Sequence, residues 1–85
     1  MQQINTETVE LKKAIIDCNY RIIEINSRPL ALKLMEMGCL NGMIIKKVSA
    51  APFKGPIVIK VSPNENLLAL RYEEAENIIL SQIDN

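Results

Sequence analysis

The side chains that most often carry catalysis or bind transition metals are scarce in this sequence. It contains no histidine, and therefore lacks the commonest general base and the commonest ligand of transition metals. Its two cysteines, Cys18 and Cys39, lie far apart and do not form the Cys-x-x-Cys pair that zinc and redox sites use. We expect two free thiols rather than a disulfide, and no catalytic, cofactor or metal site.

Two further groups of residues could bind a cation, but each has a simpler structural explanation. The acidic run at 73–76 could bind a hard metal ion, yet carboxylates in a first turn also favour a helix N-terminus. Met35, Met37 and Met43 could offer thioethers to a soft metal, but methionine commonly fills gaps in cores and ferrous iron does not prefer thioethers. We expect both groups to be structural.

The segment Pro52-Phe53-Lys54-Gly55-Pro56 is the most informative surface feature of the sequence. Its two prolines cannot donate hydrogen bonds to a sheet, so we expect the segment to project as a loop. Phe53 is the only phenylalanine, and it could fold back to cap one end of the folded domain. Alternatively, it could anchor a protein partner, because such aromatic anchors dominate interface energies.

Charge and hydropathy exclude several classes of function. Ten basic residues balance ten acidic ones, and only three residues are aromatic, which does not suit a nucleic-acid-binding surface. No apolar run is long enough to span a membrane, and the N-terminus does not resemble a signal peptide. We therefore expect a cytoplasmic protein that neither binds nucleic acid nor inserts directly into a membrane.

One helix is predicted, from Ser27 to about Met37. Ser27 is a good N-cap, and a proline follows it in the first turn, where it costs no internal hydrogen bond. Its apolar residues recur at helical spacing on one face, and Lys33 and Glu36 fall mainly on the other. Gly38 is expected to end the helix in a left-handed conformation, and Gly42 marks a further turn.

Five short strands are predicted, over residues 20–25, 43–48, 57–61, 67–71 and 78–83, with a helical turn at 73–76. Imperfect alternation in the second strand indicates a bulge or a bend. Residues 1–8 should form a loose lead-in, and Ile15 and Ile16 should pack beneath the first strand. The whole chain, 1–85, is expected to be one small closed barrel with the helix inserted after its first strand. Its predicted core comprises Ile23, Ile25, Leu34, Met37, Ile57, Ile59, Leu68, Leu70, Ile78 and Leu80.

Three blocks of the sequence, taken in order, resemble the FeoA family of ferrous iron transport. The first is Leu34-Met35-Glu36-Met37-Gly38-Cys39-Leu40-Asn41-Gly42, which resembles the end of the family's helix and its following turn. The second is Ala51-Pro52-Phe53-Lys54-Gly55-Pro56, and the third is Leu68-Ala69-Leu70-Arg71 followed by Glu74-Ala75 and Ile78. Lys54 departs from the family pattern, where a small or apolar residue is usual.

The resemblance implies a mainly β, five-stranded SH3-like barrel that acts as an accessory protein of ferrous iron uptake. It also implies a partner, a FeoB-type membrane GTPase permease, which would recruit the chain to the inner face of the membrane. We expect the partner surface to be the 52–56 loop, with Lys33 and Glu36 as a second candidate face. No enzymatic activity is expected, although Arg28 could act in trans on the partner's GTP hydrolysis.

Two alternative functions stay open from the sequence. One is a ferrous-iron-binding chaperone or sensor, and the other, less favoured by the balanced charge, is a small nucleic-acid-binding barrel. The sequence also leaves open a weak homo-oligomer and the direction in which the chain would regulate a transporter.

Overall fold

The computed structural model describes residues 7–83 and shows a mainly β fold. Its elements follow the order β1 (Thr8–Glu10), a 3-10 turn (Leu11–Lys13), β2 (Asn19–Ile25), α1 (Arg28–Glu36), β3 (Ile44–Ala50), β4 (Ile57–Val61), β5 (Asn66–Leu70), α2 (Tyr72–Ala75) and β6 (Ile78–Gln82). The predicted small barrel with an inserted helix and a C-terminal helical turn is confirmed, with six strands in place of five. The additional strand is β1, which includes Thr8 from the predicted lead-in, whereas positions 1–6 of that lead-in lie outside the described residues.

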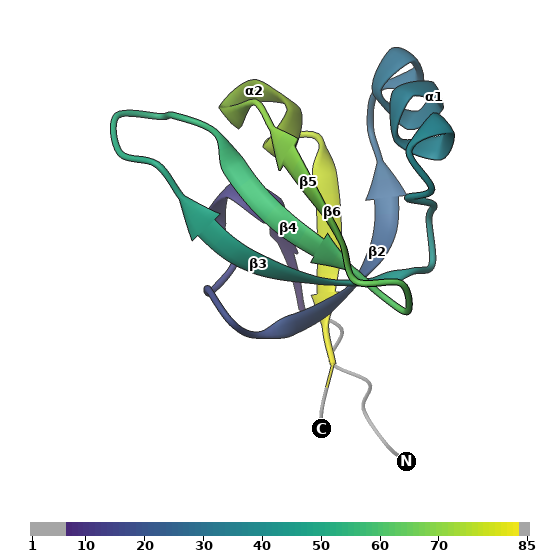
Figure 1. Cartoon of the computed structure of the whole chain (residues 1–85), viewed down its shortest axis with the longest axis horizontal. Helices are drawn as coiled ribbons and strands as arrows, with labels where there is room; N and C mark the ends of the chain where they lie inside the picture. The colour runs from purple at the N-terminus through teal and green to yellow at the C-terminus, as the bar shows by residue number, and fades with distance from the viewer. Residues whose placement is uncertain (1–6, 84–85) are drawn as a thin grey trace.

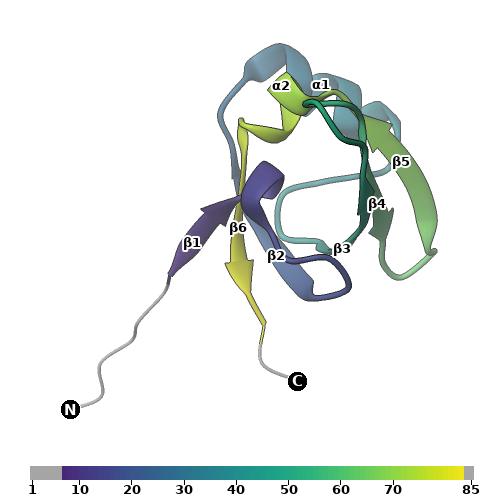
Figure 2. The same cartoon turned by 90° about the vertical axis from the view of Figure 1, so that its left-hand side faces the viewer.

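The six strands form one antiparallel sheet in the order β1-β6-β2-β3-β4-β5. The sheet curls around a single core, with β1 and β5 as its two edges (Figures 1 and 2). The expected closure is not observed in residues 7–83, because β1 and β5 do not pair with each other. Both helices lie at the upper end of the barrel in these views, and the β3–β4 hairpin projects to one side in Figure 1.

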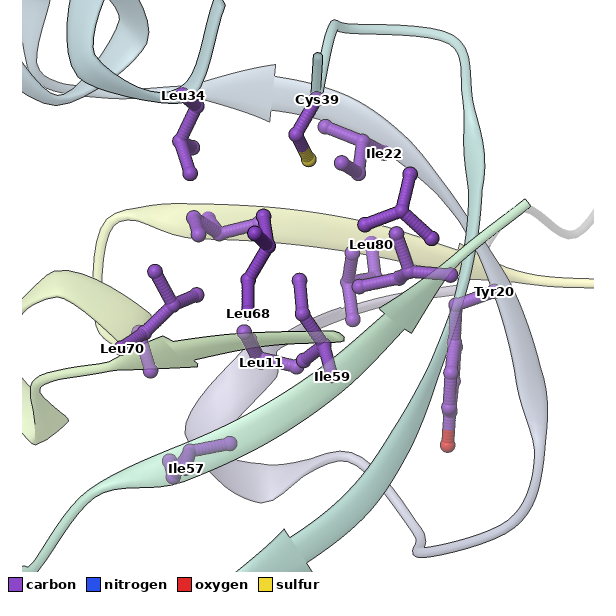
Figure 3. Packing of buried hydrophobic residues seen from close by; sticks show 14 of the residues in the cluster. Leu11, Tyr20, Ile22, Leu34, Cys39, Ile57, Ile59, Leu68, Leu70 and Leu80 are labelled. Atoms are coloured by element: carbon purple, nitrogen blue, oxygen red, sulfur yellow. The ribbon is translucent and has the colours of Figure 1, made fainter. Parts of the chain in front are cut away.

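The core confirms most of the predicted positions but corrects one of them. Figure 3 shows Leu34 of α1 above the inward side chains of β4, β5 and β6, with Tyr20 and Ile22 entering from β2. Ile23 was predicted to be buried and is 39% exposed, whereas its neighbour Ile22 is buried. Ile23 follows the inward-facing Ile22 and therefore points outward. The register of β2 against β6 shifts between Ile22 and Glu24, and this extra residue returns Ile25 rather than Glu24 to the core side, so Ile23 and Ile25 do not share a face. Ile25 and Met37 are partly buried and pack against the core cluster.

The segment before β2 also differs from the prediction. Ile15 and Ile16 do not pack beneath the strand, since they are 60% and 45% exposed. The 3-10 turn brings Leu11 and Ala14 to the core instead, because residues three apart lie on the same side of such a turn. Tyr20 fixes this loop by accepting a hydrogen bond of 2.8 Å at its hydroxyl from the backbone N–H of Ile15.

Helix α1 begins and ends where the sequence predicts, within one residue. The Ser27 hydroxyl accepts a hydrogen bond from the backbone N–H of Leu30, and Pro29 occupies the first turn. Gly38 has a φ of +80°, as predicted for the residue that ends the helix. The backbone N–H of Cys39 then donates to the carbonyl of Leu34 at 2.8 Å, which caps the last turn.

Candidate functional site

The loop between β3 and β4 is a tight hairpin that presents Phe53 and Lys54 at its tip. The backbone N–H of Ala51 donates to the carbonyl of Pro56 at 2.9 Å, and the N–H of Gly55 donates to the carbonyl of Pro52 at 3.1 Å. Phe53 and Lys54, the two central residues of the inner turn, both have a φ of +58°. This pair of left-handed residues is the pattern of a type I′ hairpin turn, which usually contains Asn-Gly or another pair with glycine.

The tip of this turn is strained by its sequence. A residue with a Cβ loses about 1–2 kcal/mol in the left-handed region, and only Gly, Asn and Asp adopt it readily. Phe53 and Lys54 both adopt this unfavourable conformation in a solvent-exposed turn. Strain of this kind is concentrated at binding and switch regions in proteins, which makes the turn a candidate site rather than a simple connection.

Gly55 is required by a close approach between the two stems of the hairpin. A Cβ at this position would lie 2.7 Å from the Cβ of Ala51 and 3.1 Å from the carbonyl oxygen of Pro52. Any larger residue would therefore push the two stems apart and change the direction of the tip.

Phe53 does not cap the barrel, because its side chain is 98% exposed. Pro52, Lys54 and Pro56 are also exposed, and Gly55 is half-buried. The loop therefore offers a free aromatic ring on a backbone that is held by two hydrogen bonds. This exposure excludes the interpretation in which Phe53 folds back onto the barrel. The other interpretation, an anchor for a protein partner, stays a prediction.

Lys54 connects the tip to helix α2. Its Nζ lies 6.0 Å from the ring centroid of Tyr72, and Lys12 Nζ lies 5.4 Å from the same ring. Lys12 also donates a hydrogen bond of 2.9 Å to Glu76, and this bond raises the pKa of the Lys12 ammonium against the opposing effect of burial. This cluster was not predictable from the sequence, because its members come from three separate segments of the chain.

The second candidate face consists of Lys33 and Glu36, and the structure places these two side chains in different surroundings. Lys33 is turned towards α2, where its Nζ donates a hydrogen bond of 2.7 Å to Glu74. Burial raises the pKa of Glu74, but its hydrogen bonds from Lys33 and from the Arg71 backbone N–H outweigh this effect, and the net pKa is lowered. Glu36 is exposed at the end of α1. The 52–56 loop and α1 lie at opposite ends of the molecule in Figure 1, so the structure does not bring the two candidate surfaces together.

In the described part of the chain, the carboxylates and thiols considered for metal binding do not converge. Within residues 7–83, no three Cys, Asp or Glu side chains lie close enough together to hold a metal ion. Cys39 is completely buried, and burial raises the pKa of its thiol to about 11. Cys18 is half-buried and, like Cys39, is a free thiol. In the same part of the chain, no helix is long and apolar enough to cross a membrane.

Sequence reasoning missed a buried lysine that stabilises the base of the barrel. Lys47 is 5% exposed, and its Nζ donates hydrogen bonds of 2.9 Å to the carbonyls of Lys12 and Ala14. A signal was present, because Lys47 shares the face of β3 with the buried Ile45. Lys47 therefore holds the 3-10 turn against the sheet and belongs to the scaffold.

Comparison with known proteins agrees with this fold. The family model of the FeoA domain matches residues 9–82. An iron(II) transport protein A from Clostridium thermocellum is 30% identical, with a TM-score of 0.78 over 88% of this chain and 46% of its own. A FeoA protein from Chlorobium tepidum is 25% identical, with a TM-score of 0.79 over 89% of this chain and 71% of its own. A FeoA-like protein from Clostridium acetobutylicum is 24% identical, with a TM-score of 0.77 over 95% of this chain and 93% of its own. No curated protein sequence matches the chain.

Proposed function

Because the chain belongs to the FeoA family, which is linked to ferrous iron transport, we propose that it acts in the cytoplasm as a non-catalytic accessory protein of ferrous iron uptake. It docks on the cytosolic part of a FeoB-type GTPase permease through the 52–56 loop. The single observation that supports this docking site is Phe53, a 98% exposed aromatic side chain on a strained but hydrogen-bonded turn.

The geometry of the loop suits recognition of a protein. Docking costs the loop little conformational entropy, because two hydrogen bonds and two prolines already restrict its backbone in the free protein. Phe53 can enter an apolar pocket of the partner with its whole ring, while the three exposed side chains around it form a rim. Burial of such a side chain contributes about 1.5–3 kcal/mol to binding.

The test is the affinity of the full chain for the permease's cytosolic GTPase domain, measured by isothermal titration calorimetry. F53A should weaken binding by about 2 kcal/mol, which is roughly 30-fold in the dissociation constant. Its melting temperature should stay close to that of the unmodified chain, because Phe53 contacts no core residue in its 98% exposed position.

L67A is the matched control, since Leu67 is also an apolar side chain with 61% exposure but lies on β5. It should bind the GTPase domain with unchanged affinity. Equal weakening by both variants, or no weakening by F53A, would contradict the loop as the docking site. An anaerobic titration with Fe²⁺ separates this function from the iron chaperone, which requires stoichiometric binding.

A further inference from the structure

Helix α1 carries an apolar stripe on the side that faces away from the barrel. Its inner face contributes the buried Leu30 and Leu34 to the core. On the outer face, Leu32 and Met35 are 51% and 49% exposed, and they lie three residues apart on adjacent turns. Leu40, which follows the helix, is 46% exposed. Packing of the barrel therefore accounts for one face of α1, and residues 7–83 leave the other, apolar face uncovered.

A shallow groove lies beside this stripe. Its volume is about 240 Å³, and its lining contains no charged residue: Ile25, Ala31, Leu32, Met35, Cys39, Leu40 and Asn41. Pockets for drug-sized ligands usually measure roughly 300–1,000 Å³. The groove is smaller than these, and its size and lining suit one or two apolar side chains from a protein.

The charges on the outer face of α1 determine what fits it. Arg28 lies four residues before Leu32, and Glu36 lies four residues after it. Each charged residue is therefore about 6 Å from Leu32 along the helix axis. Both charged side chains are exposed, and neither takes part in an ion pair with the rest of residues 7–83. The stripe is therefore an apolar centre with a positive charge at one end and a negative charge at the other.

Such a stripe is complementary to itself. When a second α1 is placed antiparallel across it with the two Leu32 residues facing each other, Arg28 of each copy meets Glu36 of the other. This arrangement has two-fold symmetry, as in most closed homodimers. Lys33 does not disturb it, because its ion pair with Glu74 keeps it towards α2.

We propose that the outer face of α1 is a self-association surface, through which two copies of this chain pair antiparallel across Leu32. One nine-residue helix is far smaller than the 20–30 residues that each side of a stable interface usually contributes, so the dimer is weak and forms at high protein concentration. In each copy the 52–56 loop lies at the end of the molecule opposite α1 (Figure 1), so both loops stay free in this dimer.

The test is sedimentation velocity of the full chain over a concentration series at low salt. The unmodified chain should shift from monomer towards dimer as its concentration rises. R28E gives a stripe that is acidic at both ends, and E36R gives one that is basic at both ends, so each variant alone should stay monomeric. An equimolar mixture of the two variants should form a heterodimer, and the double variant R28E/E36R should restore the homodimer.

These variants keep the helix intact, because an acidic residue at its N-terminus and a basic residue at its C-terminus both favour the helix dipole. K33A is the matched control, since it removes a charge on the same helix outside the stripe without placing like charges together, and it should dimerise like the unmodified chain. A chain that stays monomeric at every concentration would overturn the proposal. Dimers that persist in both single variants would equally overturn the antiparallel pairing.

Discussion

Replacement of Phe53 and Lys54 by Asn and Gly (F53N/K54G) should make the protein more stable while weakening partner binding. Both residues are left-handed at φ +58°, and relief of this strain should gain about 1 kcal/mol at each position. The new glycine costs about 0.5–1 kcal/mol of chain entropy. Loss of the contact between Lys54 and Tyr72, with 6.0 Å between ammonium and ring centroid, costs about 0.5 kcal/mol. Phe53 is 98% exposed, so its removal sacrifices no core packing.

The net expectation is a gain of roughly 0.5–1 kcal/mol, which corresponds to a rise of about 2–8 °C in melting temperature for a domain of this size. Urea denaturation measured by circular dichroism gives the free energy of unfolding, and calorimetric titration with the GTPase domain gives the affinity. E65G is the control, because Glu65 has a φ of +60° in the turn between β4 and β5. It should gain at most about 0.5 kcal/mol, because the entropy cost of the new glycine offsets most of the relieved strain, and it should bind the GTPase domain with unchanged affinity. A less stable F53N/K54G would show that the turn stores no strain.

Three further changes test the scaffold. G38A should lower the free energy of unfolding by about 1 kcal/mol, because a Cβ at φ +80° is strained even though nothing lies within 4 Å of it; an unchanged urea midpoint would contradict this. K47M should cost about 1 kcal/mol in the same assay, because the carbonyls of Lys12 and Ala14 lose their donor; equal or higher stability would show that the buried charge costs more than its bonds contribute. Burial raises the pKa of Cys39 from 9.0 to about 11, so the folded thiol stays protonated where the unfolded thiol ionises. Stability should therefore fall between pH 9 and pH 11 relative to C39A, and parallel pH profiles of the two proteins would refute this.

Most of the fold could be predicted from the sequence because its signals are local. Alternation predicted the strands around Ile57 and Leu68, and the Ser27 cap with Gly38 predicted both ends of α1. Ile23 was placed on the wrong side because alternation gives Ile23 and Ile25 the same face, whereas the register shift between them puts them on opposite faces without changing local composition. The strand β1 was missed because three residues give too short a pattern, and only its pairing with β6 defines it.

The candidate site was only partly predictable. The prolines of the 52–56 segment indicated a projecting loop, but a side chain that folds back and one that projects have the same sequence. The choice for Phe53 depends on the left-handed turn, and that turn depends on the close approach of Ala51 to Gly55 across the hairpin. The ion pair between Lys33 and Glu74 was equally hidden, because it joins two helices that come together only in the folded barrel.

The two proposed surfaces are physically separate, and this separation makes both proposals testable in one chain. The loop tip is fixed by the hairpin of β3 and β4, whereas the outer stripe of α1 depends on how Leu30 and Leu34 pack into the core. Effects of changes at distant sites without shared contacts usually add. F53A should therefore leave the sedimentation of the chain unchanged, and R28E should leave its affinity for one GTPase domain unchanged. If R28E also weakened that binding, α1 would contact the permease, and the loop would be only one part of a larger interface.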